Sequence, residues 1–263
     1  MEPSLPFLSQ WYSLAYAISF MFRHKRLLLW SALLVLTTGG FTALGFLLTT
    51  GYIDEFLAGF MLSPPEATGI WGWIKHQGWV VLHWLFLILS RIIAFYLAFL
   101  VAYSLTSPGY VFLSTAAEKF HAGEHFDADA NLSLKGVLID MVEGLKIALF
   151  GLVVTIAALS VNFIPLVGQA VLFLLYTFYS ALMFIDFPAS RRRWSLGRKI
   201  QWLQQHRNQA FRLGILPAMV SMVPVLNIFL MALLFPVLTI QTTLNFSGIE
   251  LAEKRKINSR QRG

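Results

Sequence analysis

Two adjacent cations, Lys25 and Arg26, stand immediately before a long apolar run and are a direct candidate for binding an anion. If a helix begins there, its first N–H groups have no acceptor within the helix, and its dipole adds positive charge at the same end. A divalent oxyanion that loses its hydration needs this kind of compensation. The alternative is that both residues anchor the cytoplasmic end of a membrane helix, as basic residues commonly do.

A third cation, Arg91, falls in the middle of a second apolar run. Charges within a membrane are costly and frequently functional, and they are normally paired. Glu143 and Asp140 are the candidate partners if the third helix packs beside the second. Arg91 and Glu143 then belong to a solute pathway or to a structural ion pair; the further alternative is that Arg91 is a snorkelling side chain near a crevice in the protein.

His121, Glu124 and His125 match the H-x-x-E-H string of inverted zinc peptidases. Gly123 lies inside the motif and an acidic loop follows, which disfavours the rigid helix that this chemistry requires. The chain has no cysteine, so thiolate metal sites, disulfides and cysteine nucleophiles are excluded. We therefore expect no metal site, no cofactor and no enzymatic activity.

Composition defines the surroundings of these residues. The 263-residue chain is 57% hydrophobic and 13% charged, with a mean hydropathy of +0.67, whereas a soluble domain carries about 25% charged residues. These values predict an integral membrane protein with the lipid bilayer as its solvent and one membrane domain over residues 1–263. The net charge of +7 follows the usual basic bias of cytoplasmic loops, and no nucleic-acid motif accompanies it.

The first half of the chain predicts an all-α arrangement. Residues 7–22 have apolar side chains at helical spacing and favour an amphipathic helix lying in the membrane interface. Residues 27–50 and 79–103 are uncharged or nearly so and are long enough to cross a bilayer. We expect residues 51–78 to form the loop between these two transmembrane helices.

The second half repeats one pattern twice, at residues 163–168 and 222–227. Pro165 and Pro224 end the preceding helices because proline lacks an N–H donor and clashes with the previous turn. Gly168 and Asn227 readily adopt the left-handed conformation that a reversal needs. Paired, proline-interrupted apolar segments are a sequence indicator of a solute pathway through a membrane.

The helices that flank these turns have short apolar arms. The run that starts at Ile147 lasts about 15 residues and reaches about 22 Å, whereas a bilayer crossing needs about 30 Å. The sequence therefore predicts two re-entrant, half-penetrating helical hairpins, over residues 132–186 and 213–245. A basic amphipathic helix is expected to lie on the membrane surface between them.

The orientation follows from the basic residues, which share one side if two spans cross and both hairpins return. Because Lys and Arg collect on the cytoplasmic side, both termini and the basic tail at residues 246–263 are predicted to be cytoplasmic; dual topology remains open. The clusters are Arg23, Lys25 and Arg26; Arg191, Arg192, Arg193, Arg198, Lys199, Arg207 and Arg212; and Lys254, Arg255, Lys256, Arg260 and Arg262.

Around the two turns the chain resembles the CysZ sulfate-permease family, bacterial relatives of the eukaryotic etoposide-induced membrane proteins. The resemblance covers residues 80–245 well and the N-terminus weakly. The residues that carry it are Ser107-Pro108, Ala117-Glu118, Asn162 to Gln169, Ser180-Ala181, Phe184 to Pro188, Arg192, Arg193, Ser195, Gly214, Val223 to Asn227 and Met231.

The resemblance implies two full spans and two half-penetrating hairpins in the bacterial inner membrane, assembled as a homo-oligomer. It also implies sulfate uptake for cysteine biosynthesis, by a channel-like or ion-gradient-driven route. The ungapped match places Lys25 and Arg26 on the paired arginines of the family's sulfate-binding stretch, with Arg23 in place of its glycine. The alternatives are a permease for a different small anion and a non-transporting membrane scaffold.

Overall fold

The computed structural model describes residues 11–60, 64–123, 134–161, 163–165, 167–223 and 226–262. Helix is the only regular secondary structure in these ranges, which confirms the all-α prediction. Pro224, Glu124, His125 and the start of the expected interfacial helix lie outside the described residues, as does the side chain of Asp140.

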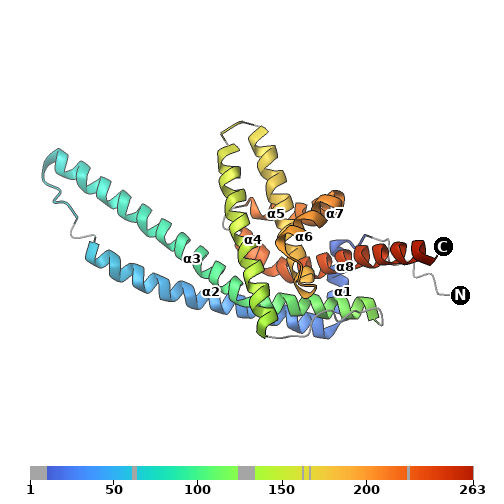
Figure 1. The fold of residues 1–263 in the computed structure, drawn as a ribbon. Helices are drawn as coiled ribbons and strands as arrows, with labels where there is room; N and C mark the ends of the chain where they lie inside the picture. Colours follow the sequence, from blue (N-terminus) through green and yellow to red (C-terminus); the bar gives the residue numbers. More distant parts are fainter. Residues whose placement is uncertain are drawn as a thin grey trace. The chain divides into compact units, whose positions relative to one another are not determined.

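The described ranges contain eight helices (Figure 1). Four of them, α2, α3, α5 and α8, include segments long and apolar enough to cross a membrane, so the chain is a multi-pass membrane protein. The helices are α1 Leu14–Arg23, α2 Lys25–Phe60, α3 Gly69–Ala122, α4 Leu134–Val161, α5 Val167–Arg191, α6 Leu196–Gln205, α7 Arg207–Ser221 and α8 Leu226–Arg262.

The chain divides into two compact units. Unit 2, Leu36–Ser107, contains α2 from Leu36 onward and α3 up to Ser107. Small residues bring these helices together: a Cβ atom on Gly45 would lie 3.1 Å from the Cβ of Ala98. The hydroxyl groups of Thr38 and Thr106 are hydrogen-bonded at 3.0 Å. Close backbone approach and interhelical polar contacts are the usual means of helix association in lipid.

The connection between α2 and α3 is shorter than the loop predicted at residues 51–78, so that prediction is wrong in its bounds. Helix α2 continues through Phe60 and α3 already begins at Gly69. The physical reason lies in the positions of the helix breakers: residues 51–60 contain no proline, whereas Pro64 and Pro65 follow that segment. Gly69, the first residue of α3, has a φ of +69°, so the chain turns where the helix begins.

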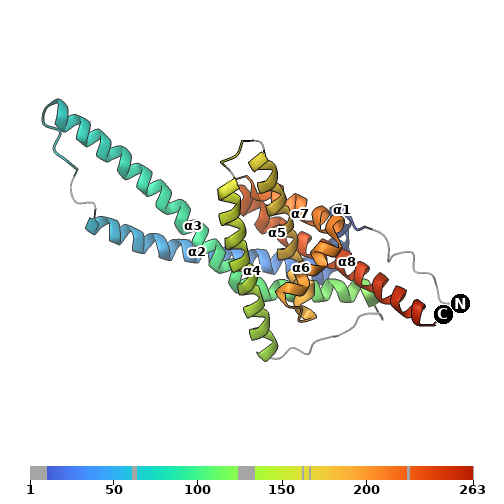
Figure 2. The ribbon, with the colours of Figure 1, turned by 45° about the horizontal axis from the view of Figure 1, so that its top comes forward.

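Unit 1, Met1–Val35 and Pro108–Gly263, is organised around α5, which contacts α4, α6, α7 and α8. Helix α5 runs beside α4 as the second arm of a helical hairpin (Figures 1 and 2). Against α7 the two backbones meet closely, because a Cβ atom added to Gly214 would lie 1.8 Å from the carbonyl oxygen of Thr177. Gly214 is thus required by space at this crossing.

The two repeated sequence patterns have matching backbone geometry. The N–H of Gly168 donates to the carbonyl of Ile164 at 2.8 Å, and the N–H of Asn227 donates to the carbonyl of Val223 at 3.0 Å. Both donors lie in the first turns of the returning helices, and neither has a positive φ. The expected left-handed conformation at Gly168 and Asn227 is therefore wrong: each residue starts the second arm of its hairpin.

The last helix is longer than the predicted arm. Helix α8 continues to Arg262, so the described part of the basic tail at residues 246–263 is helical. Its middle is fixed by the N-terminal segment: Tyr12 N–H donates to Asn245 Oδ1 at 2.9 Å, and the Asn245 amide donates to the Tyr12 carbonyl at 3.0 Å. The asparagine thereby takes up both backbone groups of one buried residue.

Candidate functional site

The predicted anion site lies where α1 ends and α2 begins. His24, between the two helices, has extended backbone angles, and its carbonyl accepts from Leu27 at 2.8 Å and from Leu28 at 3.2 Å. The N–H groups of Lys25 and Arg26 precede these first bonds of α2. The His24 ring is held by a hydrogen bond to the Phe20 carbonyl at 2.8 Å.

Lys25 and Arg26 are both exposed at this helix start. Within the described residues, no ion pair involves either side chain. The α2 dipole places partial positive charge beside them. Two cationic side chains and free backbone donors at one point can compensate an incoming anion without displacing an internal carboxylate.

A second group of charges is buried instead. Glu118, near the end of α3, is 4% exposed and forms ion pairs with two guanidinium groups. Arg191 Nη2 lies 2.8 Å from Glu118 Oε2, and Arg192 Nη2 lies 2.8 Å from Glu118 Oε1. Arg192 also donates to the Pro188 carbonyl at 3.0 Å and stacks over the Phe246 ring on α8, 5.0 Å from its centre. This network joins α3, α5 and α8.

A tight turn at the end of α5 places these arginines. The N–H of Trp194 donates to the Ala189 carbonyl, and the N–H of Arg193 donates to the Ser190 carbonyl. This pair of bonds is the Schellman arrangement, which needs a left-handed residue after the helix. Arg193 fills that position with a φ of 51°, where glycine is usual. The turn then directs the chain into α6.

Helix α6 adds a second buried pair. Lys199 is fully buried, and its Nζ lies 2.6 Å from Asp186 Oδ1 on α5. The Ser190 hydroxyl donates to the same oxygen at 3.1 Å. A charge buried in this way is tolerated only because a counter-charge and further hydrogen bonds compensate the lost hydration. The Asp186–Lys199 pair therefore attaches α6 to α5.

These contacts give Arg191, Arg192 and Lys199 partners that the sequence does not identify, although all three belong to the basic clusters that predict the orientation. All three are paired with acids inside unit 1 and cannot be treated as anchoring charges. The sequence did carry a signal: Glu118 and Asp186 terminate long apolar stretches. Acids in such positions are rarely left unpaired, so each of them indicates a cationic partner elsewhere in the chain.

Glu143 binds the first turn of α6. Its Oε2 accepts the N–H of Leu196 at 2.8 Å and so caps the first turn of α6, and Oε1 accepts from Lys146. The hydrogen bond from Lys146 is the largest cause that lowers the pKa of Glu143, the bond from Leu196 acts in the same direction, and burial opposes both. An anionic group at a helix N-terminus is stabilising.

Within the described residues, Arg91 pairs with Asp54. Of the two expected partners, Glu143 pairs with Lys146, and the side chain of Asp140 lies outside the described residues. Asp54 lies in the extension of α2 that replaces the predicted loop, which explains why the sequence did not suggest it. Both residues belong to unit 2, and their side chains are partly exposed. The pair links α2 to α3 within unit 2.

The zinc motif gains no support from its described part. His121 packs edge-on against Tyr12, with ring centres 5.0 Å apart. Within the described residues, no group of three or more histidine, aspartate or glutamate side chains is placed to hold a metal ion. His121 thus has a packing role in the structure.

Residues 13–232 match the sulfate transporter CysZ/etoposide-induced protein 2.4 family. The chain belongs to this family. The matched range includes Lys25 and Arg26 as well as the buried charges around Glu118 and Asp186. Among curated proteins, none matches the chain. The family description is that of a transporter-type membrane protein.

Proposed function

We propose that this chain is an inner-membrane sulfate permease that supplies sulfur for cysteine biosynthesis by a channel-like or ion-gradient-driven route. Membership of the sulfate transporter CysZ/etoposide-induced protein 2.4 family is the observation that carries this proposal. The substrate is a divalent oxyanion, and no catalytic step is required. The protein works as a homo-oligomer in the bacterial inner membrane, with both termini on the cytoplasmic side.

Lys25 and Arg26 are the proposed substrate-binding residues. The electrostatics of the two cationic regions favours this site over the buried network. An anion that bound Arg191 or Arg192 would have to displace Glu118 from both guanidinium groups. At the start of α2 the cations are exposed and the backbone donors point out of the helix end, so binding needs no such exchange.

The binding assignment is tested by sulfate affinity in purified, correctly inserted protein. Lys25→Gln and Arg26→Gln each remove a charge-assisted hydrogen bond, worth about 1.5–3 kcal/mol, so affinity is expected to fall roughly tenfold to a hundredfold. Arg26→Lys should retain more affinity than Arg26→Gln, because it keeps the charge and loses only the two-donor geometry.

Arg198→Gln is the matched control, since Arg198 is exposed and its guanidinium stacks on Trp194, 4.4 Å from the ring centre. Arg192→Gln would not serve as a control, because Arg192 is paired with Glu118. Unchanged sulfate affinity in both Lys25→Gln and Arg26→Gln would show that these residues do not bind sulfate and would favour a role in membrane anchoring. Sulfate flux into proteoliposomes tests transport itself, and its absence in well-folded protein would favour the scaffold alternative.

We also propose that α4–α5 and α7–α8 are re-entrant hairpins and that only α2 and α3 cross completely. The exposed tips support this arrangement, since Phe163 is 88% and Val223 is 44% exposed. Apolar side chains at a helix turn are better accommodated in hydrocarbon than in water. The competing arrangement has α5 and α8 crossing as well, which their lengths allow.

Single cysteines in this cysteine-free chain distinguish the two arrangements. Cysteines at Phe163 and Val223 should resist a membrane-impermeant thiol reagent added from the periplasm. A cysteine at Thr68, between the two crossing helices, should react readily and serves as the positive control. Rapid labelling of both tips, in a population shown to insert in one orientation, would establish full crossings and reject the re-entrant hairpins.

A further inference from the structure

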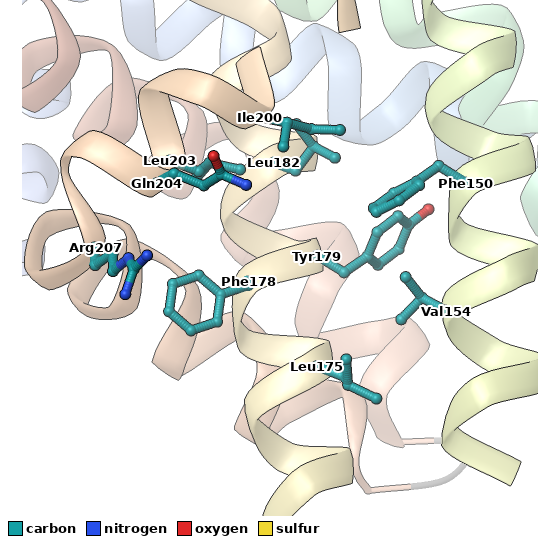
Figure 3. A pocket seen from close by; sticks show the side chains of 10 residues that line it. All are labelled: Phe150, Val154, Leu175, Phe178, Tyr179, Leu182, Ile200, Leu203, Gln204 and Arg207. Carbon is teal, nitrogen blue, oxygen red and sulfur yellow. The ribbon is translucent and has the colours of Figure 1, made fainter. Parts of the chain in front are cut away.

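An apolar groove in unit 1 lies between α4, α5, the second half of α6 and the start of α7 (Figure 3). It has a volume of about 370 Å³. Helix α4 supplies one side and α6–α7 the other, with α5 between them. The apolar walls include Phe150, Val154, Leu175, Phe178 and Leu203.

The polar groups of the groove are unevenly placed. Gln204 and Arg207 are exposed and lie together on the α6–α7 side (Figure 3). The Tyr179 ring lies toward α4, where the missing side chain of Gly151 leaves room for its hydroxyl group: a Cβ atom there would lie 2.1 Å from that oxygen. One end of the groove is therefore cationic, and the remainder is apolar.

These features exclude sulfate from the interior of the groove, because a divalent ion would lose too much hydration among apolar walls. They match an amphiphile with one negative charge at its polar end. We propose that the groove binds an anionic phospholipid, with one acyl chain between α4, α5 and α6 and the phosphate at Arg207. This inference does not depend on sulfate transport.

The size of the groove agrees with one chain. A methylene group fills about the volume that a water molecule occupies in the liquid, roughly 30 Å³, so the groove accommodates on the order of a dozen carbons. The acyl chain itself gives little selectivity, since bilayer hydrocarbon is as apolar as these walls. Discrimination between lipids must then come from the headgroup and Arg207.

Lipid binding to the full-length protein in detergent tests the proposal by native mass spectrometry. Dioleoyl phosphatidylglycerol and dioleoyl phosphatidylcholine have the same acyl chains, so their affinity ratio isolates the headgroup. A single basic residue near a membrane surface favours anionic lipid by about fivefold. The wild-type protein should show this ratio, and Arg207→Gln should reduce it to about one.

Arg212→Gln is the matched control, because Arg212 is an exposed arginine of the same helix that stacks on Trp11 and does not line the groove. It should leave the ratio unchanged. Leu175→Trp fills the apolar part and should weaken binding of both lipids. Gln204→Trp, at an exposed position over the groove, repeats this test if Leu175→Trp does not fold.

Two results would overturn the proposal. An equal ratio of phosphatidylglycerol to phosphatidylcholine affinity in Arg207→Gln and Arg212→Gln would show that Arg207 does not bind the headgroup. Undiminished phosphatidylglycerol binding in the groove-filling variants would mean that Arg207 attracts phosphate without the acyl chain entering the groove, as a free anion would also do.

Discussion

Alanine at position 214 is expected to force α5 and α7 apart. The new Cβ atom would lie 1.8 Å from the carbonyl oxygen of Thr177 and 2.8 Å from its carbonyl carbon. Carbon and oxygen atoms in contact are normally separated by at least about 3.3 Å, so the two backbones must separate by roughly 1.5 Å at this point. Both opposing atoms belong to a helix backbone, and no side-chain rotation can relieve the collision.

The energetic cost follows from that displacement. A gap of 0.5–1 Å already forfeits about a quarter to a half of the dispersion energy of each contact across an interface. Overpacked cores typically lose about 1–3 kcal/mol, and a backbone collision of this size belongs at the upper end. We therefore expect Gly214→Ala to lose about 3 kcal/mol, which lowers the midpoint of thermal unfolding by roughly 6–12 °C.

The assay is the loss of monodisperse full-length protein from a size-exclusion column after heating in detergent. Gly144→Ala is the control, because a Cβ atom at this position in α4 would meet nothing within 4 Å. Its better helix propensity should leave the midpoint unchanged or raise it slightly. A Gly214→Ala midpoint within about 2 °C of the wild-type value would refute the close backbone approach.

Two further perturbations address the charged residues. Glu118→Gln should destabilise the protein by about 3–5 kcal/mol, because it removes the buried carboxylate that pairs with Arg191 and Arg192; thermal unfolding of Glu118→Gln/Arg191→Gln should recover part of the loss, and full additivity would contradict the network. Glu143 has a lowered pKa, so its contribution is present above the usual value of 4.5 and is lost as pH falls through the lower folded-state pKa. Thermal midpoints of wild type and Glu143→Gln should accordingly converge below pH 4.5, and a pH-independent difference would contradict this role.

The sequence predicted the helical class and the two turns because these depend on local chemistry. Long apolar runs specify membrane helices, and a proline ends a helix wherever it removes a needed donor. The repeated turn pattern did correspond to equivalent hydrogen bonds at Gly168 and Asn227. The backbone conformation at these two positions was wrong, since a helix start and a left-handed reversal favour overlapping sets of residues.

The charge pairing could not be predicted in the same way. Asp54 and Arg91 are 37 residues apart, and the arginines that meet Glu118 are still farther along the chain. Their meeting depends on helix lengths and on the turn at Arg193, which no periodicity reveals. Basic residues that follow an apolar helix have the same spacing whether they anchor it in the headgroups or fold back onto an acid. The exposed position of Lys25 and Arg26, by contrast, follows directly from a helix start.

The buried ion pairs have a direction along the chain that bears on biosynthesis. Glu118 precedes Arg192 by 74 residues, and Asp186 precedes Lys199 by 13. The acid of each pair is therefore translated first, and during synthesis the N-terminal part of a chain is available before the rest. A chain that terminates between residues 119 and 190 has Glu118 near the end of α3 without its two guanidinium partners. An unpaired Glu118 carboxylate therefore distinguishes a truncated chain from a complete one. The carboxylate is paired only when the end of α5 and the following turn have been made.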